Sequence, residues 1–249
     1  MMNNPFSLKG KTILVTGAAS GIGKATAQLC ASSGASLILV DVNEKGLEEV
    51  AGFLGQNHLA SFPVDLTDSA KIEGMVDNLP KLDGVVSNAG IVFSLLAKFN
   101  ERPDLEKIFS INTFSHIDLI QSIIVKKKLN KGASLVFTSS MSGVYCGIVG
   151  GSLYGATKAA LAGYAKALAL ELAPRGIRVN TVHPGMVETP LTSKTALSAD
   201  VLEEDRKNYP LGRYGRPEEI AASMVYLLSD ATAWMTGSQI LIDGGYSLR

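Results

Sequence analysis

The sequence predicts an α/β fold in which a doubly wound parallel sheet carries helices on both faces. Short β-branched or apolar runs alternate with longer helical patterns along the whole chain, as parallel strands joined by helical crossovers require. The strand runs are almost continuously apolar, which is typical of strands buried on both faces. Neither a Pro- or Ser-rich linker nor an internal repeat divides the 249 residues, so we expect a single domain.

The pattern assigns each element in turn. Strands are predicted at 12–16, 36–40, 59–64, 84–87, 134–138, 178–182 and 239–242, and helices at about 21–33, 44–54, 69–79, 104–129, 154–173 and 217–228. One segment, 186–210, is polar, irregular and longer than an ordinary connection. Long loops in compact domains are often functional, so we expect a substrate lid there, with a plain surface excursion as the alternative.

Composition excludes several classes of protein. Lys plus Arg and Asp plus Glu both number 23, so no net charge attracts nucleic acid or an anionic membrane. Cys30 and Cys146 are far apart, and neither they nor the three histidines show metal-ligand spacing. The segment 1–9 lacks a signal-peptide core, and no window approaches 18 uninterrupted apolar residues. We therefore expect a soluble cytoplasmic protein without a metal, a nucleic-acid partner or a membrane partner.

The one basic cluster, Lys126–Lys128, falls near the end of a predicted helix. Cations are favoured there by the helix dipole and by water. We interpret the cluster as a solvated helix end, with an anion site as the alternative.

A glycine-rich turn, Thr16–Gly23, follows the first predicted strand and opens the first helix. Gly17 and Gly21 can adopt backbone angles that other residues avoid, and Gly23 permits close contact between helix and sheet. The free N–H groups at the start of the helix suit a pyrophosphate. The spacing differs from the usual Gly-x-Gly-x2-Gly, and a plain tight connection is the alternative. The position after the first strand favours a dinucleotide site.

Asp41 ends the second predicted strand, where a carboxylate can bind the hydroxyls of an adenosine ribose. The same charge would repel the 2′-phosphate of NADP. Ser20 and Val42 supply no positive charge for that phosphate, and a solvated helix face accounts for Lys24 and Lys45. We therefore expect NAD, with NADP less favoured.

Tyr154 and Lys158 lie four residues apart on a predicted helix and so share one face. An ammonium group near a phenol lowers its pKa, so the tyrosine can exchange a proton with an alcohol or carbonyl oxygen. Such pairs arise by chance on many helices, and a partly buried Tyr beside a solvated Lys is the alternative. The segments 137–143 and 88–90 follow strands that should end at the same edge of the sheet, where ligands bind in such folds. Their position favours an active site.

Together these motifs resemble the short-chain dehydrogenase/reductase family over essentially the whole chain, from Lys11 to Asp243–Gly245. The resemblance implies a Rossmann-type fold and a nicotinamide-dependent oxidoreductase that interconverts a secondary alcohol and a ketone. The matching segments are Thr16–Gly23, Asp65, Asn88–Gly90, Asn112, Ser140, Tyr154 with Lys158, Asn180–Thr189 with Pro184 and Gly185, and Asp243–Gly245.

The resemblance also implies residue roles. Tyr154 would be the general acid/base, and Lys158 would lower its pKa and bind the nicotinamide ribose. Ser140 would orient the substrate carbonyl, Asn112 would hold a water that links Lys158 to solvent, and Asp65 would contact the adenine. The other cofactor contacts would be Gly17, Ser20, Gly21, Ile22, Gly23, Asp41, Leu66, Asn88, Ala89, Gly90, Pro184, Gly185, Val187 and Thr189.

The choice of serine rests on local spacing. The family's serine usually begins a Ser-x2-Gly segment, which selects Ser140 with Gly143 over Ser139 or Ser142. Fourteen residues separate Ser140 from Tyr154, one more than is commonest in the family, so we expect an altered loop around Gly150 and Gly151.

Other functions remain open. An NADP(H)-dependent beta-ketoacyl-acyl-carrier-protein reductase is one, with Arg175 and Lys128 as candidate contacts to an acidic carrier. An inactive nucleotide sensor or scaffold is another. We expect a moderately apolar small-molecule substrate, and the resemblance implies a homotetramer built on the helices near 104–129 and 154–173 and the C-terminal segment. The expected pocket residues are Ser94, Leu95, Val144, Cys146, Met186 and 191–209.

Overall fold

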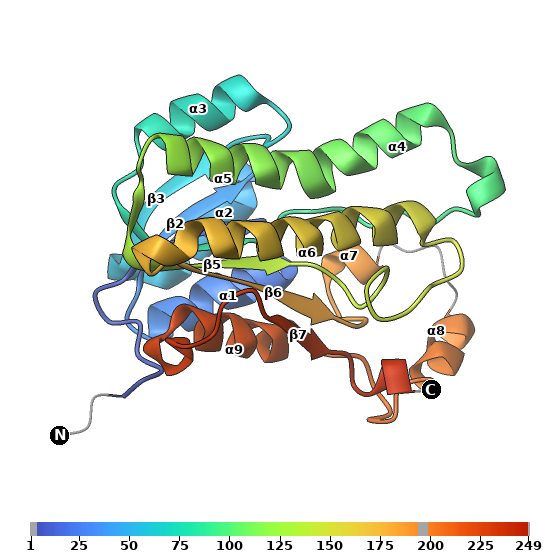
Figure 1. Cartoon of the computed structure of the whole chain (residues 1–249). Helices are drawn as coiled ribbons and strands as arrows, with labels where there is room; N and C mark the ends of the chain where they lie inside the picture. The colour runs from blue at the N-terminus through green and yellow to red at the C-terminus, as the bar shows by residue number, and fades with distance from the viewer. Residues whose placement is uncertain (1–3, 194–198, 249) are drawn as a thin grey trace.

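A computed structural model of the protein describes residues 4–193 and 199–248. Its centre is a parallel sheet of seven strands in the order β3-β2-β1-β4-β5-β6-β7, with helices on both sides (Figure 1). The order reverses between β1 and β4, so the connections leaving these two strands diverge and open a crevice at their carboxyl ends. The predicted doubly wound α/β fold is confirmed.

The elements follow the predicted alternation. The strands are β1 (Thr12–Thr16), β2 (Ser36–Asp41), β3 (His58–Pro63), β4 (Leu82–Ser87), β5 (Leu129–Thr138), β6 (Arg178–Pro184) and β7 (Gln239–Ile242). The helices are α1 (Gly21–Ser32), α2 (Glu44–Leu54), α3 (Ser69–Asp77), α4 (Arg102–Phe109), α5 (Ser115–Val125), α6 (Ser152–Leu172), α7 (Pro190–Ser193), α8 (Ala199–Arg206) and α9 (Pro217–Leu228). A π-helical turn, η3 (Ser110–Phe114), joins α4 to α5.

Two apolar cores lie on opposite faces of the sheet. Neighbouring residues of a strand point to opposite faces, so Leu14 of β1 belongs to one core while Ile13 and Val15 belong to the other. Helices α3, α5 and α6 close the first core, and α1, α2 and α9 close the second. Burial on both faces explains why the strand segments read as continuous apolar runs.

The helix predicted at 104–129 starts two residues earlier, contains the π turn and ends at Val125. Lys127 adopts a left-handed backbone (φ 53°), and Leu129 already belongs to β5. Lys127 is exposed at the end of α5, as predicted, whereas the two lysines beside it have partners. Lys126 pairs with Asp77 at 2.5 Å, and Lys128 Nζ donates to the carbonyl of Asp77 at 3.0 Å, so both lysines hold the end of α3.

The segment 186–210 is more regular than predicted, because it contains α7 and α8, while residues 194–198 fall outside the described part. The hydroxyl oxygen of Tyr214 lies 2.8 Å from a carboxylate oxygen of Asp205 and 3.1 Å from the carbonyl oxygen of Leu202, so its one proton is shared between these two acceptors. These bonds tie α8 to the chain just before α9.

Among the described residues, one continuous helical stretch, Arg102–Val125, has the length and mean hydropathy (1.3) of a membrane span. Its residues Leu119, Ile120 and Ile123 are fully buried in the first core. Its apolar character is therefore that of a helix packed on a sheet.

We predict that Lys127→Gly stabilises the protein. The left-handed conformation costs a non-glycine residue about 1–2 kcal/mol, and the flexibility of glycine in the unfolded chain offsets part of that gain. The net rise in the free energy of unfolding should be about 0.5–1 kcal/mol, measured by urea denaturation. Lys131→Gly is the matched control, because Lys131 is exposed within β5 and should lose stability instead. A loss at both positions would contradict the prediction.

Candidate active site

The glycine-rich turn links β1 to α1 and is tightly folded. Gly17 and Gly21 have φ of 64° and 51°. A Cβ on Gly17 would lie 2.9 Å from the side-chain nitrogen of Asn88, and one on Gly23 would lie 2.0 Å from the carbonyl oxygen of Gly17. In the described part of the chain, the side chain of Ser20, the N-cap residue, accepts no hydrogen bond from the first turn of α1. The N–H groups at the start of this helix are therefore suited to an anionic group.

Asp41 lies beside this turn, at the end of β2. One carboxylate oxygen accepts from the backbone N–H of Ala19 at 3.0 Å, and the other accepts from that of Asn43 at 3.0 Å. The side chain thus fastens the glycine-rich turn to β2, a role that the sequence does not reveal. Each oxygen retains a further lone pair for a ribose hydroxyl.

Asn88 braces the ends of three strands. Its backbone N–H and that of Ala89 donate to the hydroxyl of Thr16 at 2.9 and 3.0 Å. Its side chain donates to the Thr16 carbonyl at 3.2 Å and accepts from the hydroxyl of Thr138 at 2.9 Å. The ends of β1, β4 and β5 are thereby fixed relative to one another. Thr16 and Thr138 lie in segments that the sequence analysis named, but it gave neither residue a role.

Asn112 lies in the π turn and is fully buried. Its side-chain oxygen accepts from the backbone N–H of Ile91 at 2.8 Å, and its nitrogen donates to the carbonyl of Ile91 at 2.9 Å. A Cβ on Gly90 would lie 3.1 Å from the Asn112 oxygen and 3.4 Å from the ammonium nitrogen of Lys158. Glycine at position 90 therefore allows Asn112 and Lys158 to approach the same point.

Lys158 is 3% exposed, and its ammonium group donates to the carbonyl of Thr138 at 2.9 Å. Burial lowers the pKa of Lys158 to about 8. A pKa near 8 leaves the side chain mostly charged at neutral pH.

Tyr154 contacts Ser140, but the direction of its pKa shift differs from the expectation. Burial raises the pKa of the phenol, and a hydrogen bond with Ser140 partly opposes that rise. The ammonium nitrogen of Lys158 lies 5.9 Å from the centre of the Tyr154 ring and bonds to a carbonyl instead. Desolvation therefore outweighs the predicted effect of the neighbouring charge.

The two neighbouring serines have different partners. The hydroxyl of Ser139 donates to the backbone carbonyl of Lys158 at 2.8 Å in a buried contact. The hydroxyl of Ser140 accepts from the backbone N–H of Ser142 at 3.1 Å and contacts Tyr154. Ser139 thus fastens β5 to α6, and Ser140 faces the phenol.

A close contact between two glycines brings the serine turn to α6. Gly143 has φ of 85°, and a Cβ there would lie 2.2 Å from the carbonyl oxygen of Gly155, the residue after Tyr154. The loop that follows packs on the chain after β4, since the N–H of Leu95 donates to the carbonyl of Gly150 at 2.9 Å. Two loops expected to line the substrate pocket therefore lie together.

The chain after β6 lies beside β7 and the glycine-rich turn. The N–H of Gly185 donates to the carbonyl of Ile242 at 2.9 Å, and a Cβ on Gly21 would lie 3.2 Å from the methyl carbon of Thr189. The segment therefore runs from Pro184 to the glycine-rich turn.

Three predicted cofactor contacts have buried or partly buried side chains. Leu66 and Val187 are buried in the cores, and Ile22 packs against one of them. These residues can offer a ligand mainly their backbone.

Asp65 accepts from the N–H and the hydroxyl of Thr67 at 2.9 and 2.8 Å, and these bonds lower its pKa.

A buried histidine, His116, supports the floor of the site, and sequence analysis missed it. Its Nε2 lies 2.8 Å from the carbonyl oxygen of Ala89, and its Nδ1 lies 2.5 Å from the hydroxyl of Ser87. Burial lowers the pKa of His116 to about 3, with a smaller effect of the Lys158 charge in the same direction. His116 is therefore a neutral support.

Among residues 4–193 and 199–248, no cluster of His, Cys, Asp and Glu could hold a metal.

Comparisons with known proteins agree with this geometry. Residues 17–247 match the family described as Enoyl-(Acyl carrier protein) reductase. The 3-oxoacyl-[acyl-carrier-protein] reductase FabG of Thermotoga maritima is 37% identical, with 96% of this chain and 98% of that protein covered. The NAD-dependent glycerol dehydrogenase of Listeria innocua is 34% identical, with 98% and 96% covered.

Solved structures show the same fold. The 3-ketoacyl-(acyl-carrier-protein) reductase of Brucella melitensis, complexed with NADH, has a TM-score of 0.87 at 30% identity, with 97% of this chain and 100% of that chain covered. The RhlG/NADP complex of Pseudomonas aeruginosa has a TM-score of 0.90 at 31% identity, with 99% and 100% covered. The protein is therefore an oxidoreductase of the short-chain dehydrogenase/reductase family, with its Rossmann-type fold and its activity on CH–OH groups.

Proposed function

We propose that the protein is an NAD(H)-dependent oxidoreductase that interconverts a secondary alcohol and a ketone, with Tyr154 as the general acid/base. The observation that carries the proposal is the contact between Tyr154 and Ser140 at the carboxyl edge of the sheet, beside the buried ammonium of Lys158. Two hydroxyl groups that converge beside a cation are suited to bind and protonate one carbonyl oxygen.

In the reductive direction, Ser140 would donate a hydrogen bond to the substrate carbonyl oxygen, and Tyr154 would give that oxygen its phenolic proton. The bound nicotinamide supplies the hydride. Lys158 would bind the nicotinamide ribose and keep a positive charge close to the phenol. Because the side chain of Asn112 is engaged with Ile91, we propose that the backbone of the π turn holds the water that links Lys158 to solvent.

The cofactor would lie along the carboxyl edge of the sheet. Its pyrophosphate would meet the start of α1, and Asp41 would bind the adenosine ribose and disfavour NADP. Asp65 would contact the adenine, and Thr189 would approach the nicotinamide carboxamide. Leu66 and Val187 would take part through their backbone. We propose that the segment 186–210 closes over the substrate.

A beta-ketoacyl-acyl-carrier-protein reductase is the second candidate. Exposed apolar residues follow β4 and β5, among them Leu96 (45% exposed) and Val149 (86% exposed), and they would suit an acyl chain better than a polyol. Arg175 and Lys128 do not favour this candidate, because both donate to backbone carbonyls at the amino edge of the sheet. Asp41 favours NADH in either case.

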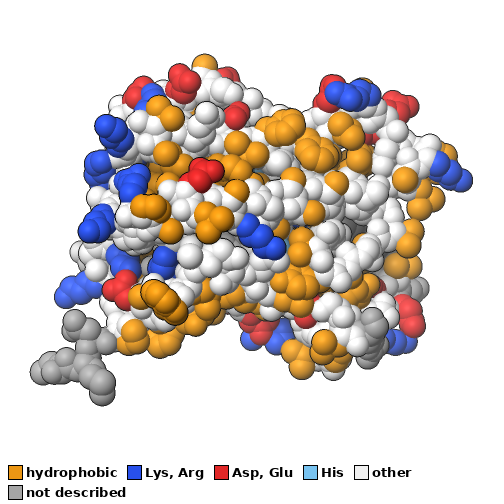
Figure 2. Space-filling view, viewed as in Figure 1, with side chains coloured by type: hydrophobic (Ala, Val, Ile, Leu, Met, Phe, Trp, Pro, Cys, Tyr) orange, Lys and Arg blue, Asp and Glu red, His pale blue; other side chains and the backbone are white. Residues whose placement is uncertain are grey.

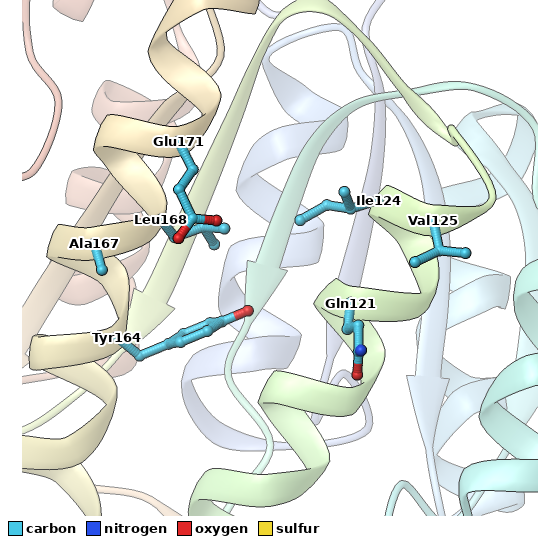
Figure 3. Close-up of a pocket in the computed structure, with 7 residues that line it drawn as sticks. All are labelled: Gln121, Ile124, Val125, Tyr164, Ala167, Leu168 and Glu171. Atoms are coloured by element: carbon cyan, nitrogen blue, oxygen red, sulfur yellow. The ribbon is translucent and has the colours of Figure 1, made fainter.

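We further propose a homotetramer in which a groove between α5 and α6 forms part of an interface (Figure 3). The groove has a volume of about 210 Å³ and is lined by Gln121, Ile124, Val125, Tyr164, Ala167, Leu168 and Glu171. Val125 and Leu170 are 69% and 79% exposed at or beside it. In the space-filling view, apolar side chains spread over this face, whereas Lys and Arg gather at the side where β5 begins (Figure 2).

A cytoplasmic location is part of the proposal. Cys30 and Cys146 are both free thiols, as suits a reducing compartment.

Substitutions of the proposed catalytic residues should distinguish an enzyme from a protein that only binds the cofactor. With a ketone panel and NADH, Tyr154→Phe should lower kcat by about 10² to 10⁴, the usual contribution of a positioned acid. Cofactor binding, followed by NADH fluorescence, should persist. Ser140→Ala should lose activity strongly, and Ser139→Ala should keep most of it, because Ser139 bonds to the backbone of α6.

Tyr226→Phe on α9 is the matched control and should behave as wild type. Full activity in Ser140→Ala would overturn the choice of serine. Turnover that survives Tyr154→Phe would overturn the proposed acid/base.

Cofactor preference should follow Asp41. The wild type should have a higher kcat/KM with NADH than with NADPH. Asp41→Asn removes the charge that repels the 2′-phosphate. The ratio of kcat/KM with NADH to kcat/KM with NADPH should therefore fall about tenfold, equivalent to about 1.4 kcal/mol. Asp83→Asn is the control, because Asp83 also accepts from a backbone N–H, that of Thr12, at the opposite edge of the sheet. A wild-type preference for NADPH would refute the role of Asp41.

Light scattering after gel filtration should give a molar mass four times that of one chain for the wild type. Leu170→Glu places a charge on the proposed interface and should yield smaller species with an unchanged circular dichroism spectrum. Phe53→Glu on α2, where Phe53 is 64% exposed, is the control and should remain tetrameric. Tetramers in both variants would exclude this face as the interface.

A further inference from the structure

His183 of β6 is a second fully buried histidine, and the mechanism above does not use it. Its Nδ1 lies 2.9 Å from the carbonyl oxygen of Ser140, and its Nε2 lies 2.7 Å from the hydroxyl of Thr181. A carbonyl oxygen only accepts hydrogen bonds, so Nδ1 must carry the proton. Nε2 then accepts from the Thr181 hydroxyl, which selects this tautomer of the neutral ring.

The surroundings keep the ring neutral and fixed. Burial is the main cause that lowers the pKa of His183, and the charges of Lys166 and Lys158 on α6 act in the same direction, against the bond to Ser140. The ring of Tyr145 packs edge-to-face on the imidazole, with centres 5.2 Å apart and planes at 84°. Packing on one side and a hydrogen bond at each nitrogen leave the ring one orientation.

The contact matters because of which peptide group it holds. The carbonyl of Ser140 and the N–H of Met141 belong to a single peptide unit. The N–H donates to the carbonyl of Pro184 at 3.0 Å, and the carbonyl accepts from His183. Two consecutive residues of β6 therefore hold both ends of the peptide unit that follows the Ser140 side chain. Within the described part of the chain, this carbonyl accepts from no backbone N–H.

We propose that His183 is a positioning residue, whose Nδ1–H bond to the Ser140 carbonyl orients the Ser140 hydroxyl toward Tyr154 and the substrate oxygen. The inference rests on the proposed function, since it assigns Ser140 its role there. The hydroxyl of Ser140 also bonds to the N–H of Ser142, so a rotated peptide unit would move the whole serine turn. Removing the histidine donor leaves a buried carbonyl unsatisfied and frees that rotation.

Two variants separate positioning from packing. In His183→Asn, the side-chain nitrogen is as many bonds from Cα as Nδ1 is, so the donor to Ser140 is kept. His183→Leu keeps an apolar side chain of comparable size and removes the donor. Ser134→Ala is the matched control, because it removes another buried bond of β5, the 2.8 Å contact between the Ser134 hydroxyl and the carbonyl of Leu227.

Kinetics of alcohol oxidation give the first readout. In His183→Leu, kcat should fall about tenfold or more while KM for NAD changes little. The oxidation rate should rise with pH as Tyr154 ionises. This rise should occur at higher pH in the variant, because the bond with Ser140 lowers the pKa of the phenol and the displaced serine no longer makes it. His183→Asn should recover most of kcat and the wild-type profile. Ser134→Ala should lower only the melting temperature.

NMR gives a readout that does not depend on turnover. Long-range ¹H–¹⁵N spectra should show the His183 ring in the Nδ1–H tautomer from pH 6 to 8. The ¹³Cζ signal of Tyr154, assigned with Tyr154→Phe, should shift in His183→Leu and not in His183→Asn. A protonated ring, the Nε2–H tautomer, or an unmoved Tyr154 signal with an unmoved pH profile would overturn the inference. Lack of turnover by the wild type would refute the proposed function, and the spectra would still decide the role of His183.

Discussion

At the end of β5, Thr138 donates through its hydroxyl to Asn88 and accepts through its carbonyl from Lys158. One residue thus joins the floor of the expected cofactor site to the helix that carries Tyr154 and Lys158. The bond to Lys158 also partly compensates a buried ammonium, which would otherwise be costly to hold out of water. The distance between the two halves of the site is set by the backbone of this strand and its packing.

Burial shifts the pKa of three side chains around Thr138 toward the neutral form. It lowers the pKa of His116 to about 3 and that of Lys158 to about 8, and it raises the pKa of Tyr154. All three shifts disfavour the charged form. In the described site the phenol and the imidazole are therefore neutral at physiological pH, and Lys158 supplies the charge. The hydrogen bond with Ser140 partly opposes the effect of burial on the pKa of the phenol.

The sequence was sufficient for the strands and for most of the helices, because these depend on periodic burial. The roles of Tyr154 and Lys158 stay a prediction from a short motif. The segments that contain Thr138 and His183 were named, but neither residue was given a role, because a polar residue in a buried strand acquires its partners only when distant segments meet. The pKa direction of Tyr154 was predicted wrongly for a related reason. Spacing on a helix gives the neighbouring charge, whereas desolvation depends on everything packed around the phenol. The helices within 186–210 were missed because both are short and their sequence is polar.

The π turn at Ser110–Phe114 has a consequence for how the chain tolerates change. One residue of an α-helix turns the chain by about 100°. The wider π turn accommodates one extra residue, so α4 and α5 keep their relative phase despite it. Deleting one residue within the turn would regularise the helix and leave both halves in phase, but it would remove the π turn that holds Asn112. The position of Asn112 is therefore secured by the residue count of this helix, and a shortening elsewhere in the same helix would displace it as surely as a substitution.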